Sequence, residues 1–111
     1  MKQVRIEKPM TECLLEAFKN NAIITSDGLS EGEFIHVCGG KAYYEDGGYL
    51  GYFSETNEIL NLQDWTRKHK WYIIGYLDEQ EVQAIKEMRK NPIVYRCFCY
   101  EEKLKEILNG E

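Results

Sequence analysis

Residues 33–53 read EFIHVCGGKAYYEDGGYLGYF, and this stretch decides the fold class. Apolar, aromatic and β-branched residues recur in three short runs, which turns at Gly39-Gly40 and Asp46-Gly47-Gly48 separate. Glycine adopts the positive φ angles that tight hairpin turns require. The stretch therefore predicts an antiparallel meander of three strands. The expected strands are Glu33–Cys38, Lys41–Glu45 and Tyr49–Phe53.

The residues before the meander predict a strand, a helix and a second strand-like run. Gln3–Glu7 alternates apolar with polar residues, and Pro9 ends that alternation. Thr11 is expected to cap an amphipathic helix over residues 12–19, and Asn20-Asn21 provides its stop signal. The apolar, β-branched run Ala22–Thr25 follows.

The residues after the meander predict a further strand and two helices. Trp71–Leu77 is a dense strand-like run, and Asp78 is expected to cap a helix in which Val82, Ile85 and Met88 repeat at three-residue spacing. The other expected features are a loop at Ser54–Asn61, a helical turn from Asn61 or Gln63 to Lys68, a helix stop at Asn91-Pro92, a strand at Ile93–Cys99 and a last helix at Glu101–Leu108. Together these elements predict a single α+β domain over residues 1–111, with a twisted antiparallel sheet, a short N-terminal helix and two C-terminal helices.

Composition and charge narrow the function classes. A 111-residue chain with 43% apolar and 30% charged residues is typical of one folded domain, and it has no apolar run long enough for a membrane span. No charged segment followed by an apolar stretch opens the chain, so we expect the protein to stay in the cytosol. The net charge of −5 disfavours direct binding of duplex nucleic acid but suits a basic groove on a protein partner.

The four cysteines raise the question of a metal site. Cysteines in the cytosol are expected to be reduced thiols rather than disulfides. On strands, His36-x-Cys38 and Cys97-x-Cys99 would each place two soft ligands on one face, so a Cys3His zinc site is one interpretation. Four buried, inert thiols are the other, and the absence of zinc-knuckle spacing favours it. We predict no metal and no cofactor.

Catalytic motifs are absent from the sequence. A nucleophilic Cys or Ser needs a base within hydrogen-bond reach, and only His36 and His69 are available. No nucleophile elbow, zinc-protease motif or P-loop occurs. We therefore predict a binding protein rather than an enzyme.

Fourteen aromatic residues are the most unusual compositional feature. Arg67, Lys68 and Lys70 alternate with Trp65 and Trp71, which brings cations and stacking planes together as nucleotide ligands require. The alternative is that tyrosines pack well on a pleated sheet and that the cations form a solvated helix face. Because several exposed Tyr and Trp side chains would form an apolar patch, we also expect a homo-oligomer.

A series of short motifs follows in order along the chain. They are Leu15-Glu16-Ala17-Phe18-Lys19, Ile24-Thr25, Gly28-Leu29-Ser30, Phe34-Ile35, and the segment from Asp64 through Trp71-Tyr72-Ile73-Ile74. In this order the chain resembles a phage-encoded family, the Thoeris anti-defence 2-like domain, which includes an anti-CRISPR member. The resemblance covers residues 11 to about 77. It departs from the family at Leu29, Ser30 and Lys70, where the family has Trp, Asn and an acidic residue.

The resemblance implies a phage counter-defence protein that acts in the host cell cytosol without catalysis. One mechanism is a sponge that sequesters a cyclic nucleotide immune signal at an oligomer interface. The alternative is an anti-CRISPR-type inhibitor that blocks a defence effector protein by direct contact. The acidic charge favours the inhibitor, and the cations among aromatics favour the sponge. For a ligand, the expected site residues are Asp64, Trp65, Arg67 and Trp71, with Tyr43 or Tyr44 as a wall.

Overall fold

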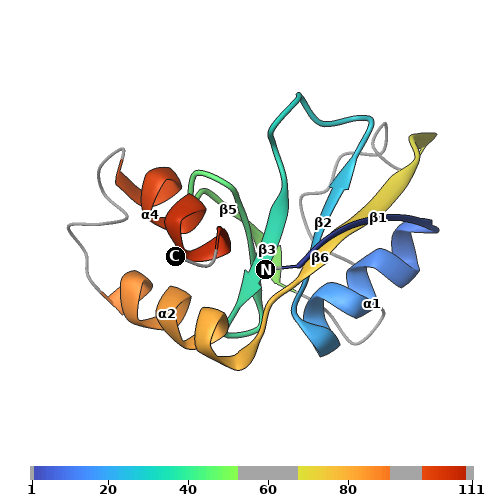
Figure 1. The fold of residues 1–111 in the computed structure, drawn as a ribbon. Coiled ribbons are helices and arrows are strands. Elements are labelled where there is room, and N and C mark those ends of the chain that lie inside the picture. The colour runs from blue at the N-terminus through green and yellow to red at the C-terminus, as the bar shows by residue number, and fades with distance from the viewer. Residues whose placement is uncertain (1, 53–67, 91–98, 110–111) are drawn as a thin grey trace.

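The chain folds into a sheet with helices on both faces, as seen in a computed structural model that describes residues 2–52, 68–90 and 99–109. Within those residues, six strands form one antiparallel sheet and three helices pack against it. Helix α1 covers one face, while α2 and α4 lie together on the other (Figure 1). The α+β class, with one N-terminal and two C-terminal helices, is confirmed.

The N-terminal part forms β1 (Lys2–Lys8), α1 (Met10–Asn20) and β2 (Ala22–Ser26). The prediction that Thr11 caps α1 is wrong: Pro9 occupies the N-cap, with no side-chain cap hydrogen bond. The fixed φ of proline suits the entry to a helix and lets it begin earlier than expected. The stop signal is confirmed, because Asn21 adopts a left-handed conformation and its N–H bonds to the Glu16 carbonyl.

Strand β6 (Trp71–Tyr76) lies between β1 and β2 and is antiparallel to both. Trp71 pairs with Lys8 on one side and with Ser26 on the other. Strands β1 and β2 are thus parallel to each other, and α1 makes the crossover between them. Insertion of β6 therefore links β1 to β2 within the sheet, because those two strands do not pair with each other.

The meander is confirmed as β3 (Ile35–Cys38), β4 (Lys41–Tyr44) and β5 (Tyr49–Tyr52). The sheet order is β1-β6-β2-β3-β4-β5, so the meander extends the sheet beyond β2. The junction between β2 and β3 is narrow, with Ile24 and Ile35 as its register pair. Beyond that pair the two strands separate into a loop that projects from the sheet (Figure 1).

The two C-terminal helices are α2 (Glu79–Lys90) and α4 (Cys99–Leu108). Asp78 caps α2 as predicted: its Oδ1 accepts the Glu81 N–H at 2.7 Å, and Glu81 Oε1 accepts the Asp78 N–H at 3.0 Å. The predicted end of a strand at Cys99 is wrong, because Cys99 begins α4. The rest of that strand, the loop over residues 54–61 and most of the predicted helical turn lie outside the described residues.

Each face of the sheet has its own apolar core. On the α1 face, Trp71 and Ile73 of β6 are each 1% exposed and pack with residues of α1 and of the meander. Full burial of one such large side chain contributes about 1.5–3 kcal/mol. On the other face, Ile85 and Met88 of α2 pack with Tyr100 and Leu104 of α4. The three-residue spacing predicted for α2 is therefore confirmed as a core stripe.

Gly47, in the turn between β4 and β5, allows a matched test of this packing. Its φ is +86°, and a Cβ added there would lie 2.8 Å from the Tyr100 ring. Gly32 has a similar φ of +84° and open space around its added Cβ. Both Gly→Ala changes should cost about 1–2 kcal/mol of backbone strain. Gly47→Ala should cost a further 1–3 kcal/mol, roughly, because it overpacks the ring.

Urea unfolding of the two variants beside the parent measures the difference. Equal losses in Gly32→Ala and Gly47→Ala would mean that the turn does not press against α4.

Candidate functional site

The residues predicted to bind a ligand do not gather in the described part of the chain. Trp71 is 1% exposed in the α1-side core, whereas Tyr43 is 8% exposed and faces α2, where the Arg89 guanidinium lies 3.5 Å from its ring centroid. Tyr44 packs on the Trp71 side, but β2 and β3 lie between their strands. Asp64, Trp65 and Arg67 lie outside the described residues, so their part in a site stays a prediction.

A buried polar cluster stands between the meander and the C-terminal helices. His36 is fully buried, and its Nε2 lies 2.8 Å from the Tyr100 hydroxyl. Its ring also contacts Tyr43 at a centroid distance of 5.9 Å. Burial, and then the Arg89 guanidinium, lower the pKa of His36 to about 3. This imidazole is therefore a neutral structural group at physiological pH and does not face solvent as a general base.

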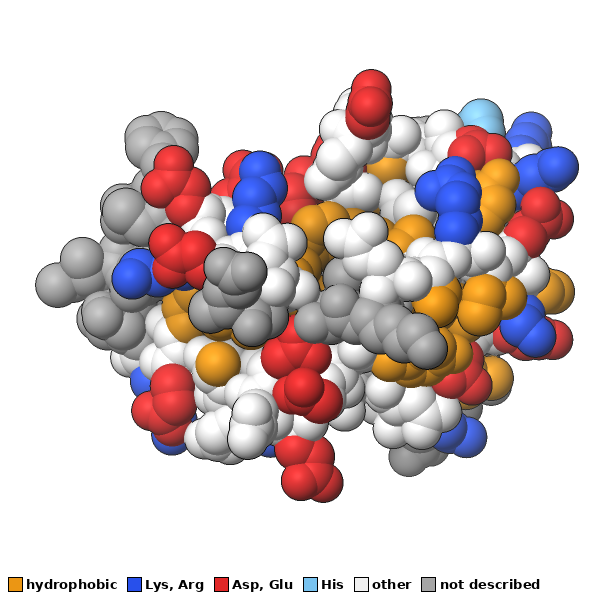
Figure 2. Space-filling model, in the orientation of Figure 1, with side chains coloured by type: hydrophobic (Ala, Val, Ile, Leu, Met, Phe, Trp, Pro, Cys, Tyr) orange, Lys and Arg blue, Asp and Glu red, His pale blue; other side chains and the backbone are white. Residues whose placement is uncertain are grey.

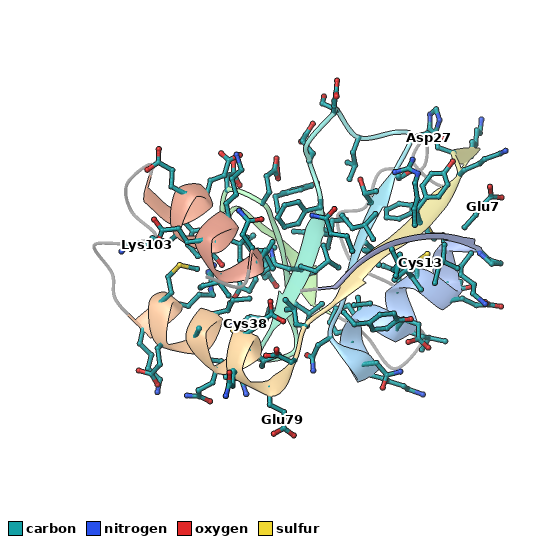
Figure 3. All side chains as sticks on the ribbon, in the orientation of Figure 1. Glu7, Cys13, Asp27, Cys38, Glu79 and Lys103 are labelled. Atoms are coloured by element: carbon teal, nitrogen blue, oxygen red, sulfur yellow. The ribbon has the colours of Figure 1, made fainter. Side chains whose placement is uncertain are left out.

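The structure describes the side chains of two of the four cysteines, and these two lie on opposite sides of the sheet. Figure 3 shows Cys13 on α1 and Cys38 beside α2. Burial raises the pKa of Cys13 to about 11 and also raises the pKa of Cys38, which disfavours a reactive thiolate at both. Cys13 is buried as expected, but Cys38 is only partly so. Within the described residues, no three potential ligand side chains are grouped to hold a metal ion.

The loop between β2 and β3 is held by its own polar groups. Thr25 Oγ1 donates to the Glu33 carbonyl at 2.8 Å, which ties the two ends of the loop together. The Ser30 N–H donates to Glu33 Oε1 at 2.9 Å, and Ser26 Oγ donates to the Lys70 carbonyl at 2.9 Å. The bond from Ser30 orients the Glu33 carboxylate, and the other two bonds anchor the loop to the sheet.

One pocket of about 390 Å³ opens where β2 and β3 separate. At its edge the Arg5 guanidinium lies 4.0 Å from the Tyr72 ring centroid and 3.8 Å from Asp27 Oδ1, while the Tyr72 hydroxyl donates to Asp27 Oδ2 at 3.0 Å. Arg5 and Asp27 are largely exposed, so their pair contributes little to stability. These three residues form the edge of the pocket, where Tyr72 and Asp27 already contact the Arg5 guanidinium.

The floor of this pocket is apolar and continues towards α4. Phe34 and Ile74 line it, and they also line a neighbouring pocket of about 400 Å³ that reaches Lys105 and Leu108. Figure 2 shows hydrophobic side chains in the middle of this view, below the projecting loop. The two pockets together form a groove with an apolar floor.

A third pocket, of about 360 Å³, lies on the other side of the same loop. It shares Leu29, Ser30 and Glu33 with the first pocket, and the β4–β5 turn supplies Glu45 and Asp46. Three carboxylates of the β2–β3 loop and two of the β4–β5 turn therefore line these two pockets, and we call this surface the acidic face. Its residues are Asp27, Glu31, Glu33, Glu45 and Asp46.

The electrostatics of the acidic face show most clearly at Glu45. Its side chain is 9% exposed. Burial raises the pKa of Glu45; a hydrogen bond from its own backbone N–H partly opposes this, and the nearby carboxylates of Glu33, Asp46 and Glu101 raise the pKa further. Among the described residues that line the first and third pockets, Arg5 is the one base. The face therefore disfavours anions and attracts cations.

The sequence alone did not single out the acidic face. Its acidic residues are spread over two turns about fifteen positions apart, and each turn by itself resembles an ordinary solvated loop. The pairing of Arg5 with Tyr72 was also missed, since these residues are far apart in the sequence. The placement of β1 beside β6 brings them together. The available signal was an excess of acidic residues in the loop before the meander and in the second turn of the meander.

No protein-family model matches the chain, and no curated protein or solved structure shows significant similarity to it. Among the helices that the structure describes, none is long and apolar enough to span a membrane.

His36 gives a prediction about pH. The pKa of His36 is about 3 in the folded protein against an ordinary value of 6.5, so below pH 6.5 the unfolded chain binds a proton that the folded protein refuses. The free energy of unfolding should fall as pH decreases through this window, by about 1.4 kcal/mol per pH unit from this group. In His36→Phe the slope of the unfolding free energy against pH should be smaller by that amount, whether the variant is more or less stable than the parent.

Denaturant unfolding at a series of pH values measures this slope. The parent, unfolded over the same pH series, provides the reference slope. A His36→Phe slope equal to that of the parent would contradict the buried, neutral imidazole.

Proposed function

We propose that this chain is a non-catalytic binding protein that presents its acidic face to a basic groove on a protein partner, as a phage counter-defence inhibitor of a defence effector would. The observation that carries the proposal is the negative charge of the acidic face. Five carboxylates lie on the projecting loop and on the turn beside it. Arg5, the one base among the described residues that line the first and third pockets, is stacked on Tyr72 and lies next to Asp27.

The chemistry of the described residues supports a binding role over catalysis. The buried imidazole of His36 and the raised thiol pKa values of Cys13 and Cys38 make poor nucleophile–base pairs. An acidic surface, in contrast, speeds and orients association with a basic one through long-range attraction. Proteins that handle nucleic acid carry such basic grooves, because they must neutralise phosphates.

The cyclic nucleotide sponge stays a prediction from the sequence. Its expected residues Asp64, Trp65 and Arg67 lie outside the described part of the chain, and Trp71 is buried. The described pockets around the acidic face would repel a phosphate. These features favour the protein-docking alternative for the surface that the structure describes.

The test uses an RNA-guided CRISPR nuclease, whose nucleic-acid channel is positively charged. The labelled parent chain should bind this nuclease, should compete with its target DNA, and should bind more weakly as salt increases. The test variant combines Glu31→Lys, Glu33→Gln and Asp46→Asn, in which Gln and Asn keep an oxygen acceptor for the loop N–H groups. It should bind about tenfold more weakly, because it loses attraction across the acidic face.

The matched control combines Glu79→Lys, Glu87→Gln and Glu12→Gln, which change the net charge by the same amount away from the acidic face. Figure 3 shows Glu79 at the opposite end of the view from Asp27. Equal weakening in both variants would mean that only net charge matters. No binding to the nuclease, together with a rise in melting temperature on adding cyclic nucleotides, would favour the sponge and reject the proposal.

A further inference from the structure

The pocket between the β2–β3 loop and the β4–β5 turn has a specific chemical character. The Tyr44 ring and the Leu29 side chain line it together with three carboxylates, those of Glu33, Glu45 and Asp46. Backbone N–H groups orient two of these carboxylates: Ser30 donates to Glu33 Oε1 at 2.9 Å, and Gly48 donates to Asp46 Oδ1 at 2.8 Å. The pocket is thus a built concavity with an aromatic wall and oriented acceptors.

Glu45 is the unusual member of this pocket. Its side chain is 9% exposed, and its Oε2 has no hydrogen-bond partner among the residues that the structure describes. A buried polar atom without a partner costs about 1–3 kcal/mol, and more when it is charged. The free protein therefore carries a destabilising carboxylate where a neutral side chain would fit. Glu45 lines the pocket, so its carboxylate lies at the wall of this cavity.

A partner that is both a cation and a hydrogen-bond donor would satisfy this Glu45 oxygen and offset the surrounding negative charge. Among the described residues no group of side chains could hold a metal ion, which favours a larger organic cation. A guanidinium satisfies the pocket best, because its planar fork donates to two carboxylate oxygens and its face stacks on an aromatic ring. An ammonium would supply the charge but would not use the Tyr44 wall as well.

We propose that this pocket is the subsite for an arginine side chain of the protein partner, with Glu45 as its principal acceptor and Tyr44 as its stacking surface. The inference rests on the proposed docking function, and it names the group that the acidic face recognises. The free energy lost by burying Glu45 without a partner is recovered when the guanidinium enters.

The experiment is an NMR titration of the labelled protein with N-acetyl-arginine amide. Backbone amides of residues 28–30 and 45–48 should shift, with a dissociation constant on the order of 1–10 mM for a single side chain. N-acetyl-citrulline amide, which has the same shape without the charge, should produce no saturable shifts there. N-acetyl-lysine amide should bind more weakly than the arginine derivative.

Glu45→Gln is the test variant, and it should bind the arginine derivative about tenfold more weakly. Glu79→Gln removes one exposed carboxylate from α2 and should bind it as tightly as the parent. Glu45→Gln should also melt about 2–5 °C above the parent at neutral pH, since it removes a buried charge that lacks a partner. A carboxylate with a structural role would instead lower the melting temperature when replaced.

The outcomes separate this inference from the docking proposal. Unchanged binding in Glu45→Gln, equal binding of the citrulline or lysine derivative, or a lower melting temperature of Glu45→Gln would each overturn the arginine subsite. The docking proposal would survive those results if the nuclease still bound the parent and not the triple variant. Arginine binding without any nuclease binding would confirm the subsite chemistry and reject that class of partner.

Discussion

The insertion of β6 between β1 and β2 is the constraint on which the rest of the structure depends. One short strand supplies Trp71 and Ile73 to the core under α1, and the same strand leads directly into Leu77 and α2 on the other face. Because β6 pairs with both β1 and β2, it joins segments more than forty residues apart in the sequence. Without that pairing, β1 would have no neighbour in the sheet and Arg5 would not meet Tyr72.

The acidic face is a consequence of where the sheet is weakly joined. The narrow pairing of β2 with β3 lets the chain between them leave the sheet as a loop, and the β4–β5 turn lies beside this loop. Like charges raise the free energy of a folded protein when they are brought together. Glu45 sits among them with a raised pKa and a buried oxygen that lacks a described partner, so local stability is sacrificed at this point. A binding surface for a cation explains such an arrangement better than a structural role does.

Local patterns accounted for most of the secondary structure and for little of the candidate site. The meander, the β6 strand, the Asn21 stop and the Asp78 cap all follow from contacts within a few residues, which the sequence shows directly. The predicted cap at Thr11 was wrong because Pro9 could begin the helix two residues sooner, and both choices satisfy local rules. Trp71 and Tyr43 were grouped in one prediction because they are aromatic, but strand alternation and sheet order place them on opposite faces.

The sequence by itself determined the α+β class, the meander, the apolar stripe of α2 and the excess of acidic charge, because each depends on periodicity, turn chemistry or composition. The tertiary structure alone decided that β6 lies between β1 and β2, that His36 is buried against Tyr100, and that Glu33 and Glu45 share a pocket. These features depend on pairing between distant segments. Such pairing is selected by burial over the whole sheet, so no local pattern encodes it.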